Sequence, residues 1–190
     1  IFAHSSIANE AATGIANLAS KMKVGDPTSE DTEIGPLIRT SEVDRVDEWV
    51  QAAIEGGAVC LSGGERASDS CYKPTVLLNP APDANVSTME IFGPVVCVYS
   101  YDDIDEAIEQ ANSLPVSFQA AVMTKDIDTA MRVYNRIDAT AVMVNEHTAF
   151  RVDWMPFSGA RQSGHGVGGI PFTMHEMQIE KMLVIRSDEL

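Results

Sequence analysis

Apolar residues recur at helical spacing in some segments of this chain and form short continuous runs in others, and the two patterns alternate. Spacing of three and four residues predicts helices at 6–22, 41–55, 102–111, 126–136 and 171–178. Apolar runs bounded by turn residues predict strands at 1–4, 58–61, 75–78, 95–99, 118–123, 140–144 and 180–186. Strands that alternate with helices build parallel sheets covered by helices. The pattern therefore predicts an α/β fold with a mostly parallel sheet and flanking helices.

The first two helices have an apolar face that we expect to be buried against the sheet. The residues of these faces are Ile7, Ala11, Ile15, Leu18 and Met22 in the first helix, and Val43, Val46, Val50 and Ile54 in the second.

No stretch rich in Pro, Gly and Ser is long enough to divide the chain, so one domain is predicted over residues 1–170. Residues 171–190 are expected to form a distinct C-terminal helix and strand. A terminal apolar strand that no helix follows leaves a sheet edge in need of a partner. We therefore expect residues 180–186 to pair with another chain.

Charge excludes two classes of partner. The chain has 13 Lys and Arg against 28 Asp and Glu, a formal charge of −15, which opposes binding to nucleic acid or to anionic membranes. No apolar run approaches the roughly 18–20 residues that span a bilayer, and no basic segment typical of a signal peptide begins the chain. Three cysteines without a C-x-x-C pair suggest reduced thiols in a cytoplasmic protein.

Residues 90–96 combine an acid, an aromatic residue and Gly-Pro directly before a buried strand. The carboxylate of Glu90 could accept hydrogen bonds from the two hydroxyls of a ribose, and Phe92 could form the wall for a nicotinamide ring. The same residues could instead be a capping acid and a core phenylalanine.

Polar and aromatic residues at 145–157 follow the strand at 140–144, and ligands of α/β proteins bind beyond the carboxyl ends of parallel strands. Arg151 is the cation of this segment. It could bind an anionic group on a substrate, or it could form a salt bridge with Asp153.

Several motifs, in the same order, resemble the NAD(P)-dependent aldehyde dehydrogenase superfamily over essentially all 190 residues. They are Val24-Gly25-Asp26-Pro27, Ile34-Gly35-Pro36-Leu37, Glu90-Ile91-Phe92-Gly93-Pro94, and Pro156-Phe157-Ser158-Gly159 with Arg161, Ser163 and Gly164 after it. Two residues depart from the usual Pro-Phe-Gly-Gly-x-Lys-x-Ser-Gly, because Ser158 replaces Gly and Arg161 replaces Lys.

The resemblance implies a cofactor, NAD or NADP, whose nicotinamide ribose is bound by Glu90 and whose ring lies near Phe92. It implies that Phe150 and Phe157 line the aldehyde tunnel, with Arg151 beside them. Val167-Gly168 replaces the family's Arg-Glu, as in the branch of glyceraldehyde-phosphate and lactaldehyde dehydrogenases. A small oxygenated or anionic aldehyde is therefore expected as substrate, and a homo-oligomer through the 180–186 strand.

The nucleophilic cysteine and the general-base glutamate of the family have no match here, so we expect them upstream of Ile1. On this interpretation the chain is a catalytic-domain portion, inactive alone. Two alternatives stay open: a non-catalytic module for oligomerisation or small-anion binding, and a cysteine hydrolase that uses Cys71 with His147 or His165.

Two further patterns do not indicate binding sites. The run 164–169 matches G-x-G-x-x-G, but a dinucleotide fingerprint follows a strand, opens a helix and has an acid about 20 residues later. The histidines lack the spacing of metal ligands, so no metal is expected.

Overall fold

A computed structural model describes residues 1–189, which group into two compact units. The first unit is Ile1–Ala107, and the second begins at Ile108. The expected division of the chain at residue 170 stays a prediction. No helix among the described residues is long and apolar enough to cross a membrane.

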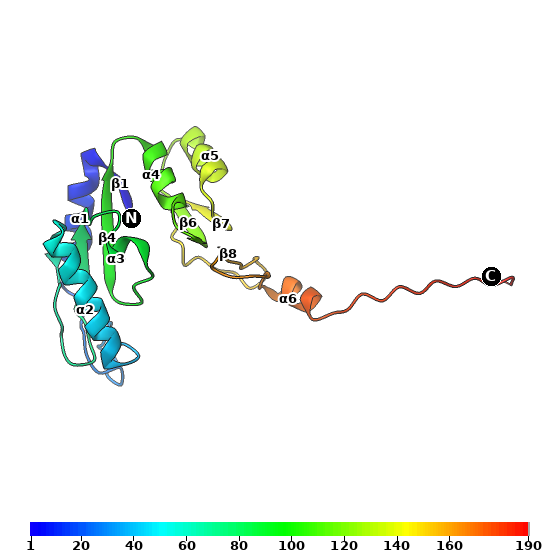
Figure 1. Ribbon diagram of the computed structural model, residues 1–190, viewed down its shortest axis with the longest axis horizontal. Helices are drawn as coiled ribbons and strands as arrows, with labels where there is room; N and C mark the ends of the chain where they lie inside the picture. Colours follow the sequence, from blue (N-terminus) through cyan, green and yellow to red (C-terminus); the bar gives the residue numbers. More distant parts are fainter. Residues whose placement is uncertain (190) are drawn as a thin grey trace. The chain divides into compact units, whose positions relative to one another are not determined.

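The first unit is built on a four-stranded sheet in the order β1-β4-β3-β2. Figure 1 labels two of these strands, β1 and β4. Its strands are β1 (Phe2–His4), β2 (Val59–Ser62), β3 (Thr75–Leu78) and β4 (Val95–Tyr101). β4 runs parallel to both β1 and β3, whereas β2 is antiparallel to β3. The register places Leu77 of β3 opposite Cys60 on one side and Cys97 on the other. The predicted mostly parallel sheet is confirmed.

Helices cover both faces of this sheet, which explains why all four residues of β3 are buried. α1 (Ser5–Ala19) packs on the face of Val76, Leu78 and Val98. α2 (Thr40–Glu55) packs on the opposite face, in a core with Leu77, Tyr72 and Val86 of the short helix α3 (Asn85–Thr88). Val43, Val46 and Val50 of α2 are fully buried, as the spacing predicted.

The apolar face expected for the first helix is wrong by one position. Ala8, Ala12 and Ala16 face the sheet and are at most 5% exposed, whereas Ile7 and Leu18 are 54% and 69% exposed. Ile15 packs at the edge of this contact, as expected, but small side chains allow the helix axis to come close to the strands, so the alanines form its centre.

The second unit contains a βαβ crossover and a two-stranded antiparallel pair. α4 (Ile104–Asn112) leads into it, β6 (Gln119–Val122) and β7 (Ala141–Val144) are parallel, and α5 (Ile127–Arg136) connects them. Asp126 caps α5 by accepting from the amides of Asp128 and Thr129 at 3.2 and 3.1 Å. β5 (Val116–Ser117) pairs with β8 (Ala160–Arg161), and α6 (Ile170–Glu176) follows.

The strand expected at 180–186 is not formed in the described part of the chain. Residues 178–187 have no helix or strand assignment and follow α6 as an extended segment, red in Figure 1. Met182, Leu183 and Val184 are each at least 79% exposed. The physical reason is that a strand requires a hydrogen-bonding neighbour, and this segment has none among residues 1–189.

Candidate functional site

Glu90 lies in the loop between α3 and β4, and its side chain is exposed. Among residues 1–189 no hydrogen bond or ion pair engages its carboxylate. The carboxylate therefore does not cap a helix, and both of its oxygens are available to accept hydrogen bonds from hydroxyl groups.

Phe92 stands on the same loop and is not a core residue. Its side chain is 74% exposed, and its backbone has a φ of 49°, which only a few per cent of non-glycine residues adopt. An exposed aromatic ring beside an unengaged carboxylate fits the nicotinamide and ribose ends of a dinucleotide, so the residues present are compatible with NAD or NADP.

Three contacts with the body of the unit hold this loop. Ile91 packs against the core, and Arg45 of α2 donates to the Ile91 carbonyl oxygen at 2.6 Å. A Cβ atom on Gly93 would meet Cγ2 of Val46 at 2.9 Å, so only glycine allows this approach. No motif in the sequence pointed to Arg45, because a cation three residues after Glu42 is typical of an ordinary surface pair.

In the second unit, Asn145 sets the direction in which the chain leaves β7. Its φ is 56°, and its side-chain amide donates to the Thr124 carbonyl at 2.8 Å and accepts from the Thr124 amide at 2.9 Å. Asparagine tolerates this left-handed conformation better than most residues. The segment 146–159 therefore starts from a fixed point beyond the carboxyl end of β7.

The three residues expected around the aldehyde lie in this segment, and two of them are in contact. The guanidinium carbon of Arg151 lies 4.2 Å from the centroid of the Phe157 ring, a cation–π geometry. The Phe157 ring meets Phe118 edge-on at 4.9 Å. Phe150 is 44% exposed and close in sequence, but no ring contact joins it to Phe157 among the described residues. The salt bridge of Arg151 with Asp153 is not formed in the described part of the chain.

A hollow of about 710 Å³ opens beside this cluster. Its walls combine one cation and one acid with residues of α6 and of the chain just before and after it. The lining residues are Arg151, Asp153, Gly169, Ile170, Thr173, Met174, Met177 and Gln178. The space is broad and largely open to solvent, so among the described residues it is a surface depression rather than an enclosed cavity. The glycine-rich run 164–169 turns the chain back so that Gly168 pairs with Phe157. The Phe157 amide donates to the Gly168 carbonyl at 3.0 Å, and the Gly168 amide donates to the Phe157 carbonyl at 2.7 Å.

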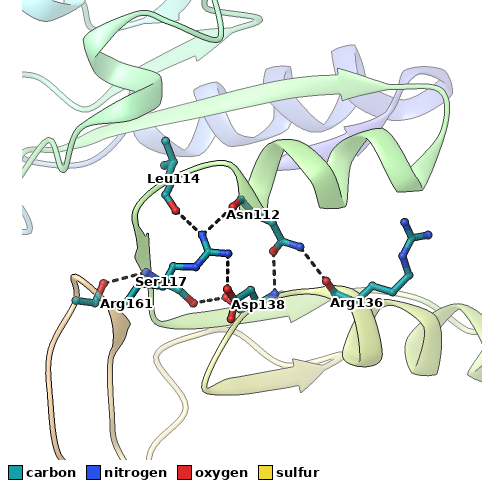
Figure 2. Close-up of polar contacts among 7 residues, drawn as sticks. Asn112, Leu114, Ser117, Arg136, Asp138 and Arg161 are labelled. Atoms are coloured by element: carbon teal, nitrogen blue, oxygen red, sulfur yellow. Dashed lines mark hydrogen bonds and ion pairs between the residues drawn. The ribbon is translucent and has the colours of Figure 1, made fainter.

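Arg161 anchors the far end of the segment (Figure 2). One guanidinium nitrogen donates to the carbonyls of Asn112 and Leu114, and the other forms an ion pair with Asp138. Ser117 adds to the same cluster, because its hydroxyl donates to the Asp138 carbonyl and its amide to Ser163 Oγ. The sequence predicted Arg161 only as a replacement for lysine, and its partners lie too far away in the chain to be inferred.

The cysteines are poor candidates for a nucleophile. Burial raises the pKa of the Cys60 and Cys97 thiols, which disfavours the thiolate. Cys71 is only 6% exposed, and its sulfur lies 3.9 Å from the hydroxyl of Ser70. The hydrolase alternative therefore lacks an accessible thiol at Cys71. Among residues 1–189 no cluster of three His, Cys, Asp or Glu could hold a metal ion.

Comparison with known proteins identifies the family. The family model described as the aldehyde dehydrogenase family matches residues 1–183. The 3-sulfolactaldehyde dehydrogenase of Priestia aryabhattai is 38% identical over 97% of this chain and 39% of its own length. The lactaldehyde dehydrogenase of Methanococcus aeolicus is 33% identical over 95% of this chain and 38% of its own length.

Solved structures agree in fold. The chain superposes on aldehyde dehydrogenase 21 of Physcomitrella patens, in complex with its reaction product succinate, with a TM-score of 0.91 and 34% identity, over 97% of this chain and 38% of that one. The NADP complex of glyceraldehyde-3-phosphate dehydrogenase from Methanocaldococcus jannaschii gives a TM-score of 0.88 and 32% identity, over 93% and 38%. The chain thus spans about two fifths of the proteins that it matches. With the family model covering all but its last residues, the chain belongs to the aldehyde dehydrogenase family.

Proposed function

We propose that the protein oxidises a small anionic aldehyde to its acid with NAD or NADP, and that this chain supplies part of each binding site. The observation that carries the proposal is a pair of charged side chains on two loops, neither of which forms a hydrogen bond or ion pair among residues 1–189: the Glu90 carboxylate, and the Arg151 guanidinium that packs on Phe157 beside the hollow. Each of them fits a different reactant of an aldehyde dehydrogenase.

Glu90 and Phe92 would hold the cofactor. The carboxylate would accept hydrogen bonds from ribose hydroxyls, which are charge-assisted and therefore strong, and the exposed Phe92 ring would pack near the nicotinamide. When bound, the cofactor supplies the hydride acceptor of the oxidation. Relatives of known structure contain either NADP or NAD.

Arg151 would bind the anionic group of the aldehyde, while Phe150 and Phe157 line its apolar part. Packing on the Phe157 ring orients the planar guanidinium, so that two of its N–H groups can donate to two oxygens of a carboxylate, sulfonate or phosphate. Relatives act on sulfolactaldehyde or sulfoacetaldehyde, and one relative of known structure holds succinate. What these relatives and the lactaldehyde dehydrogenases share is a small oxygenated aldehyde, and Arg151 is the reason to propose a negative group on it.

The nucleophilic cysteine and the general base are proposed to lie outside residues 1–190. Cys60, Cys71 and Cys97 do not offer a reactive thiolate, and the relatives are more than twice as long as the chain. We further propose that residues 180–186 form a strand on the sheet of another subunit, which would cover their exposed apolar side chains.

Substitution at Arg151 in the complete enzyme tests the substrate assignment. Arg151→Gln should raise the KM for succinic semialdehyde about tenfold or more, since a charge-assisted contact of about 1.5–3 kcal/mol is lost. The KM for butanal, which lacks the carboxylate, should change less than about twofold. Arg151→Lys is the control that retains the charge and loses the two-point geometry.

An equal rise for both aldehydes would contradict the assignment of Arg151. Absence of any cofactor-dependent aldehyde oxidation, with cofactor binding also absent, would favour the non-catalytic alternative.

A further inference from the structure

We infer that Arg45 is a positioning residue for the cofactor, acting through the loop that carries Glu90 and Phe92. The inference rests on the proposed function of these two residues. Arg45 itself has no place in the hollow or in the loop, because it belongs to α2.

The guanidinium of Arg45 is held in one orientation by two contacts from its own helix. Nε donates to the Glu42 carboxylate at 2.8 Å, and the guanidinium carbon lies 4.4 Å from the centre of the Trp49 ring. The side chain is only 26% exposed. With a carboxylate on one edge of the Arg45 guanidinium and an aromatic ring on one face, the Nη2 donor can point in only one direction.

In that direction Nη2 donates a hydrogen bond to the carbonyl oxygen of Ile91, at 2.6 Å. The peptide group that begins with this carbonyl joins Ile91 to Phe92, so its orientation sets the φ of Phe92. The value of 49° is unfavourable for an aromatic residue and requires support from the surroundings. The charge-assisted bond from Arg45 provides this support at the atom that turns the peptide.

The two loop residues are affected together, since Glu90 precedes the held carbonyl and Phe92 follows it. Without Arg45 the peptide can rotate, and Phe92 can relax to an extended conformation that turns its ring elsewhere. Ile91 packing and the close approach of Gly93 to Val46 do not depend on Arg45. The loop should therefore stay attached while its two functional side chains lose their alignment.

The test uses Arg45→Gln in the complete enzyme, measured without turnover and with it. We expect the Kd for the cofactor to rise about tenfold, as for loss of one charge-assisted hydrogen bond, while the KM for the aldehyde at saturating cofactor stays within about twofold. Amide exchange in the cofactor-free protein should become faster for a peptide covering 89–95. Arg45→Lys, which retains one donor, should recover part of the affinity.

Arg39→Gln is the matched control. Arg39 also approaches Glu42, at 3.8 Å, but it is 69% exposed and does not contact the loop. This variant should leave cofactor affinity and exchange at 89–95 unchanged. An equal effect of both variants would mean that the charge near Glu42 matters and would overturn the positioning role.

A double variant separates this inference from the proposed function. If Glu90→Gln alone weakens cofactor binding and Arg45→Gln adds little to it, Arg45 acts through the loop as inferred. If Glu90→Gln weakens binding but Arg45→Gln changes neither affinity nor exchange, the positioning role is wrong and the proposed function stands. If Glu90→Gln and Phe92→Ala have no effect on binding, the proposed cofactor role itself fails.

Discussion

Replacing Arg161 should loosen the end of the segment that carries Phe157 without unfolding the protein. Arg161→Gln removes the contacts to the carbonyls of Asn112 and Leu114 and the ion pair with Asp138 (Figure 2). Each contact of a charged donor contributes about 1.5–3 kcal/mol. The three contacts share one guanidinium, and the Arg161 side chain is 34% exposed. Solvent therefore reduces their combined contribution to about 2–3 kcal/mol.

Such a loss corresponds to a rise of about 30-fold or more in local opening, since 1.4 kcal/mol is a factor of ten. Hydrogen exchange of a peptide covering 155–165 should show this rise. Fluorescence of Trp154, which is 73% exposed and lies in the same segment, should report the change once Trp49→Phe has removed the other indole. Arg161→Lys should lose only about 1 kcal/mol, because it keeps the pair with Asp138.

Lys125→Gln is the control, because it removes one exposed cation from the same unit. Hydrogen exchange of the 155–165 peptide could instead be as slow in Arg161→Gln as in this control. The contacts of Arg161 drawn in Figure 2 would then not be what holds this segment in place.

Three further outcomes are expected. Tyr72→Phe should lower the free energy of unfolding by about 2 kcal/mol in urea titrations, because the buried hydroxyl donates to Asp47 at 3.0 Å; an unchanged midpoint would contradict this. Burial raises the pKa of Tyr99 from 10.0 to about 12, so its contribution to stability is complete below pH 10 and is lost as the pH rises to about 12; Tyr99→Phe should remove that part of the decline in alkaline unfolding curves. Deleting residues 180–190 should lower the mass measured by light scattering, and an unchanged mass would count against the intersubunit strand.

The sequence was most informative where a local signal and burial agree. Prolines on both sides of 75–78 predicted β3 at its observed bounds, and three valines predicted the buried face of α2. For α1 it was right about Ile15 but missed the buried Ala8, Ala12 and Ala16, because the periodicity of the large residues was stronger than that of the alanines. β5 and β8 have two residues each, too few to show any period.

Motifs located the loop of Glu90 and Phe92 and the segment around Arg151. They could not find Arg45 or the partners of Arg161, because Arg45 contacts a residue 46 positions away and the partners of Arg161 lie 23 to 49 positions from it. Such separations are set by the packing of helices and strands, which a single sequence does not display.

The register of the four-stranded sheet also determines which covalent bonds the native protein cannot form. Cys60 and Cys97 flank Leu77 on the two neighbouring strands, so two strand spacings of about 4.7–4.9 Å separate them. A disulfide needs Cα atoms within about 7 Å. A chain cross-linked between these two cysteines has therefore lost β3 from between them. Such a chain is more compact when denatured and migrates faster on a non-reducing gel, so the intensity of that band would measure the fraction of misfolded molecules.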